Sequence, residues 1–270
     1  MNNYLKKRLI PVILVKEGNV VQSIKFSEYK IIGKPVETIS RLNKFGSDEI
    51  ILLDISKKKE YMNYRQEDNL IHSKTFFDLV DQVSKINFLP LAAGGGIRSL
   101  KDIEKMLKIG CDKVVINTLC IENQGLINEA AKIFGSQCLV GSIDYYEDSL
   151  KRLVVKNGSK ITEVEALSLS KKLEDLGIGE IMFNSINRDG MKKGYDIDFL
   201  KKASKEINIP IIVCGGAGSW KDMLDVVKDT NCDAVAASNI FHHVEYSTYL
   251  AKKFLYDNKL NFRKAELFHN

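Results

Sequence analysis

The sequence PLAAGGGIRSLKDIEKMLKIGCDKVVINT, from Pro90 to Thr118, is echoed by PIIVCGGAGSWKDMLDVVKDTNCDAVAASN, from Pro210 to Asn239, in phase apart from one inserted residue. Each copy reads as a buried strand, a glycine turn, an amphipathic helix and a second buried strand. A weaker echo pairs GSDEIILLDIS, from Gly46, with GIGEIMFNSIN, from Gly177. Repetition on this scale indicates two copies of one multi-strand unit.

Short apolar runs recur along the whole chain, with amphipathic stretches between them. This alternation is typical of a parallel sheet with helical crossovers. One helix is marked by Ser219, a good N-cap, which is followed by apolar residues at helical spacing. The eight predicted strands are Ile10–Val15, Ile50–Ile55, Phe88–Ala93, Lys113–Asn117, Leu139–Tyr145, Ile181–Ile186, Ile211–Cys214 and Ala234–Ser238.

The repeat favours a closed barrel over an open sheet. Two copies of a four-strand unit close into eight strands, whereas a doubly wound sheet does not require two-fold symmetry. The chain has 270 residues, near the roughly 250 typical of this barrel. We therefore expect an α/β protein formed by one (βα)8 TIM barrel over residues 1–270. Its half-barrels would lie at about 1–135 and 136–258, followed by a C-terminal tail at 259–270.

The composition favours a protein that binds neither nucleic acid nor membrane. The net charge of +5 arises from lysines spread among acids, and not from one basic block. The apolar run Leu9–Val15 is too short to span a membrane and lacks a cleavage site. The odd number of cysteines and the lack of CxxC spacing indicate reduced core residues in a cytoplasmic protein. These cysteines are Cys111, Cys120, Cys138, Cys214 and Cys232.

Two glycine turns, each between a strand and a helix, are candidate anion sites. Backbone N–H groups in such a turn and at a helix N-terminus can face a phosphate, although tight turns need glycine for steric reasons alone. Occurrence at equivalent places in both copies predicts a ligand with two phosphates, or comparable anions, at its ends. One site would comprise Gly95, Gly96, Asn117 and Thr118, and its twin Gly215, Gly216, Ala237 and Ser238.

Two further motifs belong to the same end of the predicted barrel. Asp189 and Gly190, in NRDGMKKGYD, are binding candidates that could fix a loop over a ligand, although a plain Asp-Gly turn fits equally well. His242 and His243 are candidates for a metal ligand or a general base, but no acid or cysteine at ligand spacing accompanies them. A role at a helix start is therefore favoured, and we expect neither a metal nor a cofactor.

Four charged residues stand at the beginnings of predicted strands. Strand alternation puts Lys113 on the face of Asn117, which must point into the lumen if it serves a ligand. A single charge at a strand start is usually just solvated. Four charges of balanced sign instead predict an inward-facing ring that gates a small polar species. The four residues are Arg8, Glu49, Lys113 and Glu180.

Seven strings of this sequence carry a family resemblance: RLIP, GGGIRS, CDKVVINT, FGSQC, NRDG, GGAGS and AAS..FH. Through them the chain resembles the cyclase subunit of imidazole glycerol phosphate synthase, HisF, from Arg8 to about Tyr246. The resemblance implies that a HisH-type glutaminase docks on the N-terminal face and sends ammonia through the barrel. A bisphosphorylated substrate would then be cleaved and cyclised at the C-terminal face. The four strand-start charges match the family's gate residues.

The resemblance also implies acid/base work by two carboxylates, one ending the first strand and one ending the fifth. Asp144, in SIDYYED, matches the second and is the candidate catalytic residue, although it could be structural. Leu14, in RLIPVILVKEG, stands where the family has the first aspartate, and leucine cannot transfer a proton. Glu17 lies nearby with the opposite strand parity. Gln22 replaces a family lysine, and the segment Lys57 to His72 is longer than its family equivalent.

These departures favour a HisF-like synthase subunit, which by resemblance is a lyase or amidotransferase-type enzyme. Such a subunit would still deliver ammonia but would have lost the lyase and cyclase reaction. HisF-like paralogues with this pattern of kept and lost residues resemble subunits that support amidation of a nucleotide-activated sugar for surface polysaccharide. The expected partners are a HisH-type glutaminase, a separate sugar amidotransferase and a phosphorylated small molecule. Three alternatives stay open: a genuine cyclase of histidine biosynthesis, a non-catalytic activator of a glutaminase, and a phosphosugar isomerase resembling HisA, against which Leu14 argues equally.

Overall fold

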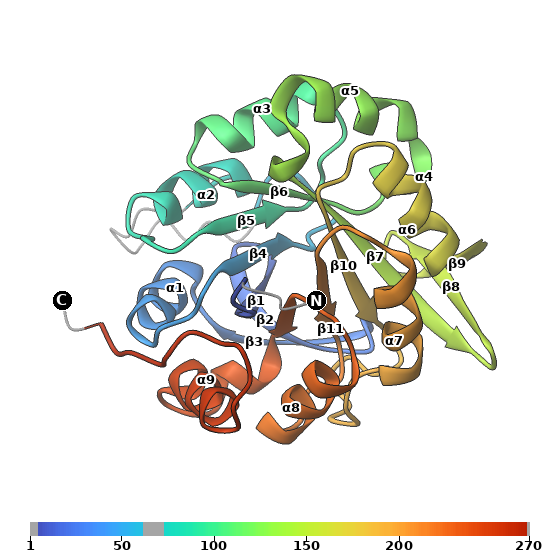
Figure 1. Ribbon diagram of the computed structural model, residues 1–270. Helices are drawn as coiled ribbons and strands as arrows, with labels where there is room; N and C mark the ends of the chain where they lie inside the picture. Colours follow the sequence, from blue (N-terminus) through green and yellow to red (C-terminus); the bar gives the residue numbers. More distant parts are fainter. Residues whose placement is uncertain (1–4, 62–72, 269–270) are drawn as a thin grey trace.

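The computed structural model describes residues 5–61 and 73–268. Eight parallel strands close into a barrel seen down its axis in Figure 1, which confirms the predicted α/β (βα)8 fold. Closure comes from pairing of β7 with β10 and of β12 with β1. In order around the barrel the strands are β1 (Arg8–Lys16), β4 (Ile50–Asp54), β5 (Leu91–Gly94), β6 (Lys113–Ile116), β7 (Leu139–Asp148), β10 (Glu180–Ser185), β11 (Ile211–Cys214) and β12 (Ala234–Ala237).

The start predicted for the third strand was wrong. The third strand was expected over Phe88–Ala93, but β5 begins only at Leu91. Phe88 is 51% exposed, and Pro90 has no N–H to donate to a sheet ladder. The carbonyl of Pro90 still accepts from the N–H of Ile50, at 2.9 Å. The apolar character of Phe88 therefore reflects packing against Phe268, with ring centroids 5.9 Å apart, and not strand structure.

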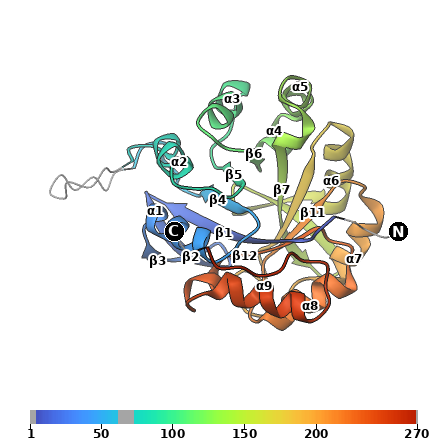
Figure 2. The ribbon, with the colours of Figure 1, turned by 60° about the vertical axis from the view of Figure 1, so that its left-hand side comes forward.

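Helices surround the barrel and bury its outer face. Figure 2 shows α9 beside α8, with α2, α3 and α5 on the far side of the strands. Matched helices of the repeat begin alike, because Ser99 of α3 and Ser219 of α8 each form a capping box with an aspartate three residues later. The helices are α1 (Pro35–Lys44), α2 (Phe76–Ser84), α3 (Leu100–Lys108), α4 (Leu119–Glu122), α5 (Gln124–Phe134), α6 (Ala166–Asp175), α7 (Ile197–Glu206), α8 (Trp220–Asp229) and α9 (Ser247–Asp257), with short 3-10 turns η1 (Ser136–Cys138) and η2 (Asn239–His242).

Strand alternation divides the apolar side chains into two cores. The larger core lies between the outer face of the barrel and the helices. A smaller cluster fills the lumen, and it includes Val12, Leu14, Val115 and Met182. Residues two apart on a strand share a face, so the parity predicted for the lumen-facing side chains is confirmed.

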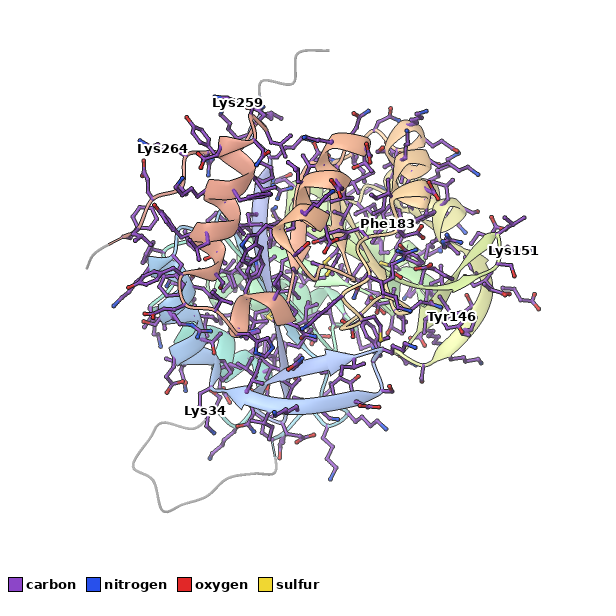
Figure 3. All side chains as sticks on the ribbon, turned by 90° about the horizontal axis from the view of Figure 1, so that it is seen from below. Lys34, Tyr146, Lys151, Phe183, Lys259 and Lys264 are labelled. Carbon is purple, nitrogen blue, oxygen red and sulfur yellow. The ribbon has the colours of Figure 1, made fainter. Side chains whose placement is uncertain are left out.

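Each half of the chain adds a β-hairpin that was not predicted from the sequence. The first hairpin, β2 (Asn19–Ile24) and β3 (Glu28–Gly33), continues from β1. The second, β8 (Lys151–Lys156) and β9 (Lys160–Glu165), continues from β7. In Figure 3 the β2–β3 hairpin runs toward the β7–β8 extension that carries the labelled Tyr146 and Lys151. This shared order of long strand, hairpin and helix supports the two-fold repeat. The half-barrel boundaries at about 135 and 258 stay a prediction.

Candidate functional site

Asp144 lies on β7 at the carboxyl end of the barrel, with its carboxylate held by two amides. Asn117 Nδ2 donates to its Oδ2 at 2.9 Å, and Asn184 Nδ2 donates to its Oδ1 at 3.3 Å. Burial raises the pKa of Asp144 to about 7, against the lowering effect of these hydrogen bonds, and the charge of Asp189 adds to the rise. A carboxyl group with this pKa can both donate and accept a proton near neutral pH.

Leu14 faces the lumen near the same mouth. It is 9% exposed and packs with Val12 and Val21 in the apolar cluster inside the barrel. Glu17 lies in the β1–β2 turn with a φ of 48°, where its N–H donates to Ser56 Oγ at 2.8 Å, and it does not line the cavity at this mouth. Gln22 lies on β2 with the opposite parity to Val21. The longer segment after β4 falls largely on 62–72, outside the described residues.

A cavity of about 210 Å³ opens at this end of the barrel. Its floor is apolar and includes Val12, Leu14 and Cys214, and its rim is made largely by loop backbone. The hydroxyl of Ser238 and Oδ1 of Asn184 are buried, and neither has a hydrogen-bond partner within residues 5–61 and 73–268. The predicted site residues that line this cavity are Asp189, Gly190, Gly215, Gly216, Ala237 and Ser238.

The structure does not bring the other predicted anion residues into this cavity. Gly95 lies against Asp54, and Gly96 is exposed. Asn117 is engaged by Asp144 and by the carbonyl of Ser142, while Thr118 Oγ1 donates to Asn157 Oδ1 at 3.0 Å. We call Gly95, Gly96, Asn117 and Thr118 the Thr118 corner, and Gly215, Gly216, Ala237 and Ser238 the Ser238 corner.

The capping boxes occupy part of the backbone donors at the two predicted anion sites. The carboxylate of Asp102 accepts from the N–H groups of Arg98 and Ser99, each at 2.9 Å. Asp222 accepts in the same way from Gly218 and Ser219, at 2.9 and 2.8 Å. Because each capping box already satisfies these donors, fewer N–H groups remain at each helix start, and an anion at either corner would also draw on the glycine loop and on side chains.

Asp189 ties the β2–β3 hairpin to the mouth of the barrel. Its Oδ2 accepts from the Ser23 hydroxyl at 2.6 Å, and its carbonyl accepts from the N–H of Lys25 at 3.0 Å. Burial raises its pKa to about 6, although the hydrogen bonds from Ser23 and Phe26 lower it. Gly190 permits this approach, since a Cβ there would lie 2.5 Å from the carbonyl oxygen of Ser23. Asp189 therefore links the β2–β3 hairpin to the loop after β10 beside the cavity, and its role in binding a ligand stays a prediction.

The cavity residues absent from the predicted site include Asn184, Lys192 and Asn239. Asn239 Nδ2 donates to the carbonyl of Ser23 at 2.7 Å and so forms a second tether for the hairpin. Asn184 could have been found by strand parity, because it shares a face with Glu180. Lys192 sits in a left-handed backbone conformation, with φ 56°, in a polar loop that gives no periodic signal.

The four predicted gate residues meet at the opposite end of the lumen. The Lys113 ammonium group lies 2.9 Å from Glu49 Oε1 and 2.8 Å from Glu180 Oε2, and Arg8 pairs with the same two carboxylates. The glutamate side chains are only 2% and 6% exposed. Burial opposes the charge on Arg8, but the glutamates outweigh it and raise its pKa. The result is a closed ring of alternating charge beneath the apolar lumen.

Several other features of the described chain add no second site. His242 is partly buried, and burial lowers its pKa to about 4, while His243 lines the cavity. No group of three or more potential metal ligands occurs within 5–61 and 73–268. The five cysteines are unpaired, and all but Cys138 are buried. Among the helices of the described chain, none has the length and apolar character needed to cross a membrane.

The closed parallel barrel, with a ligand-sized cavity at the carboxyl ends of its strands, defines a (βα)8 barrel protein with its site at the usual mouth. A family model described as histidine biosynthesis protein matches residues 8–247. The chain belongs to this family, and within it to the HisF-like proteins.

Similar proteins span nearly the whole chain. The imidazole glycerol phosphate synthase subunit HisF of Hydrogenobaculum sp. is 40% identical over 261 residues, which cover 96% of this chain and 99% of the relative. The HisF subunit of Bacillus cereus is 39% identical over 263 residues, with the same coverage. A putative imidazole glycerol phosphate synthase subunit hisF2 of Vibrio vulnificus is 39% identical over 264 residues, which cover 97% of this chain and 93% of the relative.

Proposed function

We propose that this protein is the synthase subunit of a glutamine amidotransferase complex of the imidazole glycerol phosphate synthase type. A HisH-type glutaminase would release ammonia at the N-terminal face of the barrel. The ammonia would pass the ring formed by Arg8, Glu49, Lys113 and Glu180 and travel along the lumen to a phosphorylated ligand at the carboxyl end. The names of the similar HisF subunits support this assignment of partner and reaction class.

The observation that carries the finer proposal is the contrast between the two ends of the lumen. At one end, four buried or partly buried charges form a complete ring. At the other end, Asp144 has a pKa suited to proton transfer, but Leu14 occupies the lumen face where the family resemblance requires a second carboxylate. General acid/base catalysis by two groups contributes typically 10² to 10⁴-fold for each group. We infer that ammonia delivery survives and that the lyase and cyclase reaction does not.

A paralogue with this combination fits the amidation of a nucleotide-activated sugar for surface polysaccharide. Ammonia released at the mouth would then serve a separate amidotransferase. The hisF2 name of the Vibrio vulnificus relative is compatible with a paralogous branch. The second candidate is a genuine cyclase of histidine biosynthesis, which the names of the other HisF relatives favour. Complementation of a histidine auxotroph separates the two, since only a working cyclase restores growth.

The delivery step is tested with the purified complex of this chain and its HisH-type glutaminase. We expect the chain to stimulate glutamine hydrolysis, and Lys113→Met to change the fraction of ammonia that reaches the carboxyl-end mouth. The exposed cation variant Lys108→Met is the matched control, since Lys108 lies on the outer helix α3 and pairs with Glu104. Unchanged ammonia transfer in Lys113→Met, with full stimulation, would instead support a non-catalytic activator.

A further inference from the structure

The side-chain amide of Asn184 is only half satisfied. Asn184 is 9% exposed, and its Nδ2 donates to Asp144 Oδ1 at 3.3 Å. This bond turns Oδ1 to the other side of the amide, where it is buried and has no hydrogen-bond partner within residues 5–61 and 73–268. A reversed amide would place its oxygen against the Asp144 carboxylate, so the hydrogen-bond network selects this orientation. Oδ1 therefore requires a donor that the described chain does not supply.

Asn184 stands at the end of a line of lumen-facing side chains on β10. Glu180, Met182 and Asn184 are two residues apart, so they share the inward face of the strand. Glu180 belongs to the charged ring, Met182 to the apolar cluster and Asn184 to the lining of the cavity. The rise of a strand puts Asn184 about 13 Å beyond Glu180. A molecule that passes the ring and moves along β10 therefore meets Asn184 as the next polar side chain of that strand.

The neighbours of Asn184 leave room beside its oxygen but offer no donor. Asn184 pairs in the barrel with Cys214 on β11, whose thiol stays neutral because burial raises its pKa to about 12. A Cβ on Gly215 would lie 2.9 Å from Asn184 Oδ1, so a side chain at position 215 would fill this side of the amide. Leu14 lines the same cavity and is apolar. The partner of Oδ1 must therefore be a bound molecule.

The chemistry of this acceptor defines the class of that molecule. An amide oxygen only accepts hydrogen bonds, so an anion without a proton cannot satisfy it. The lumen below is lined by apolar side chains such as Val12 and Met182, which cannot solvate an ion. Ammonia is small and uncharged and carries three N–H donors, so it suits both the apolar path and the acceptor at its end.

We propose that Asn184 Oδ1 is a binding site for ammonia at the mouth end of the lumen. Ammonia would donate one N–H to Oδ1, while the other edge of the amide stays fixed on Asp144. The site would hold ammonia until an acceptor takes it, and would reduce its escape into water. The inference rests on the proposed delivery function and names the residue that receives the delivered molecule.

The test is titration of the isotope-labelled full chain with ammonium chloride, followed by NMR at the side-chain amides. Ammonium chloride supplies ammonia in solution, and potassium chloride is the matched salt. We expect the Asn184 amide signals to shift in a saturable way with ammonium chloride only. They should also shift more than those of Asn117, whose amide donates to the same Asp144 carboxylate.

Substitution of the acceptor should weaken this binding. In Asn184→Leu, the backbone amides of Cys214 and Gly215 report binding, and the affinity for ammonia should fall about fivefold, as for loss of one neutral hydrogen bond. Asn128→Leu is the matched control, because Asn128 lies on the outer helix α5 and donates to the Leu176 carbonyl. Its affinity for ammonia should equal that of the wild type.

Three outcomes would overturn the proposal. They are the absence of a saturable shift, which would leave water as the partner of Asn184, the same shift with potassium chloride, and equal shifts at Asn117 and Asn184, which would assign the effect to the Asp144 carboxylate. If Asn184→Leu does not fold, the wild-type titration decides alone. The titration contains no glutaminase, so failure of ammonia binding would leave stimulation of glutamine hydrolysis standing, and absence of that stimulation would not remove ammonia binding.

Discussion

Asp144 lies at the candidate site, and its pKa is raised well above the ordinary value of an aspartate. Its carboxylate is held by Asn117 and Asn184 in a setting where burial raises the pKa to about 7. The neighbouring carboxyl group of Asp189 also has a raised pKa. Near neutral pH the two groups thus resist full ionisation, because each additional negative charge is poorly solvated.

The pKa of Asp144 predicts a specific dependence of stability on pH. Its folded-state value of about 7 lies above the ordinary value of 3.8, so the unfolded chain loses this proton first as the pH rises. Asp144 therefore destabilises the fold progressively between about pH 4 and pH 7. We expect the free energy of unfolding of Asp144→Asn, relative to wild type, to rise across this range, by about 1.4 kcal/mol per unit of pKa shift.

Urea denaturation at half-unit pH intervals measures this difference. Asp148→Asn is the control, since Asp148 is exposed at the end of the same strand. A constant difference between Asp144→Asn and wild type from pH 4 to pH 7 would show that Asp144 ionises in the folded state as it does in water.

At the scale of elements, the β2–β3 hairpin acts as a tethered cover of the cavity. Ser23 is fully buried and joins Asp189 and Asn239 to the hairpin. The hairpin tip also meets the second hairpin, since a Cβ on Gly158 would lie 3.7 Å from the ring of Phe26. The two hairpins thus enclose the mouth from the two halves of the barrel.

We expect Ser23→Ala to loosen this cover without unfolding the barrel. The change removes the shorter of two hydrogen bonds to Asp189 Oδ2 and leaves only that from the N–H of Phe26, at 3.4 Å, which costs about 1 to 3 kcal/mol locally. Hydrogen exchange at the amides of Lys25 and Phe26 should accelerate at least about fivefold, while β7 and β10 keep their protection. Ser27→Ala, which removes only an exposed bond to the Ile24 carbonyl, is the control. Equal exchange in both variants would mean that Asp189 does not hold the hairpin.

The sequence predicted the barrel strands far better than the hairpins that cover the mouth. Buried strands carry continuous apolar runs, and Ser99 and Ser219 mark helix starts directly. The hairpin strand β9 is partly or fully exposed along its length and carries Lys160, Glu163 and Glu165 on its surface, whereas β8 buries the adjacent residues Val154 and Val155. Without one buried face they show no apolar alternation, so local patterning could not reveal them.

The candidate site was predictable to the extent that the repeat determines the backbone. Both glycine loops lie at the carboxyl ends of their strands, as expected. The difference between the corners depends on partners distant in sequence, such as Asn157 with Thr118 and Lys156 with Glu122. Such contacts arise from the folded hairpins, which were not predicted from the sequence.

At the scale of the whole molecule, a buried ion pair joins the last helix to the start of the barrel. Lys252 of α9 is 5% exposed, donates to Asp48 Oδ1 at 2.7 Å and donates to the carbonyl of Gly46 at 2.9 Å. The other oxygen of Asp48 accepts from the N–H of Leu9. The pair therefore connects β1, the residues before β4 and α9, and so helps to close the barrel.

Lys252→Met should be strongly destabilising. Removal of one partner of a buried ion pair typically costs about 3 to 5 kcal/mol, because the remaining charge loses its close partner. Arg263 Nη1 lies 3.6 Å from Asp48 Oδ1, but its side chain is 66% exposed and replaces little of the lost contact. The adjacent Lys253→Met is the control, since Lys253 pairs with Asp257 on the surface, where such pairs contribute about 0 to 1 kcal/mol. Denaturant unfolding measures both values. A similar small loss in the two variants would contradict a structural role for the Asp48 pair.

The proposed loss of cyclase chemistry is tested most directly by turnover of the bisphosphorylated substrate of imidazole glycerol phosphate synthase, with ammonium supplied in place of glutaminase. Wild type and Leu14→Asp are assayed side by side. We predict no cyclisation by the wild type above the rate in buffer, because Leu14 cannot transfer a proton. Wild-type turnover at an ordinary enzyme rate, roughly 1 to 10³ s⁻¹, would contradict the prediction and identify the chain as a working cyclase.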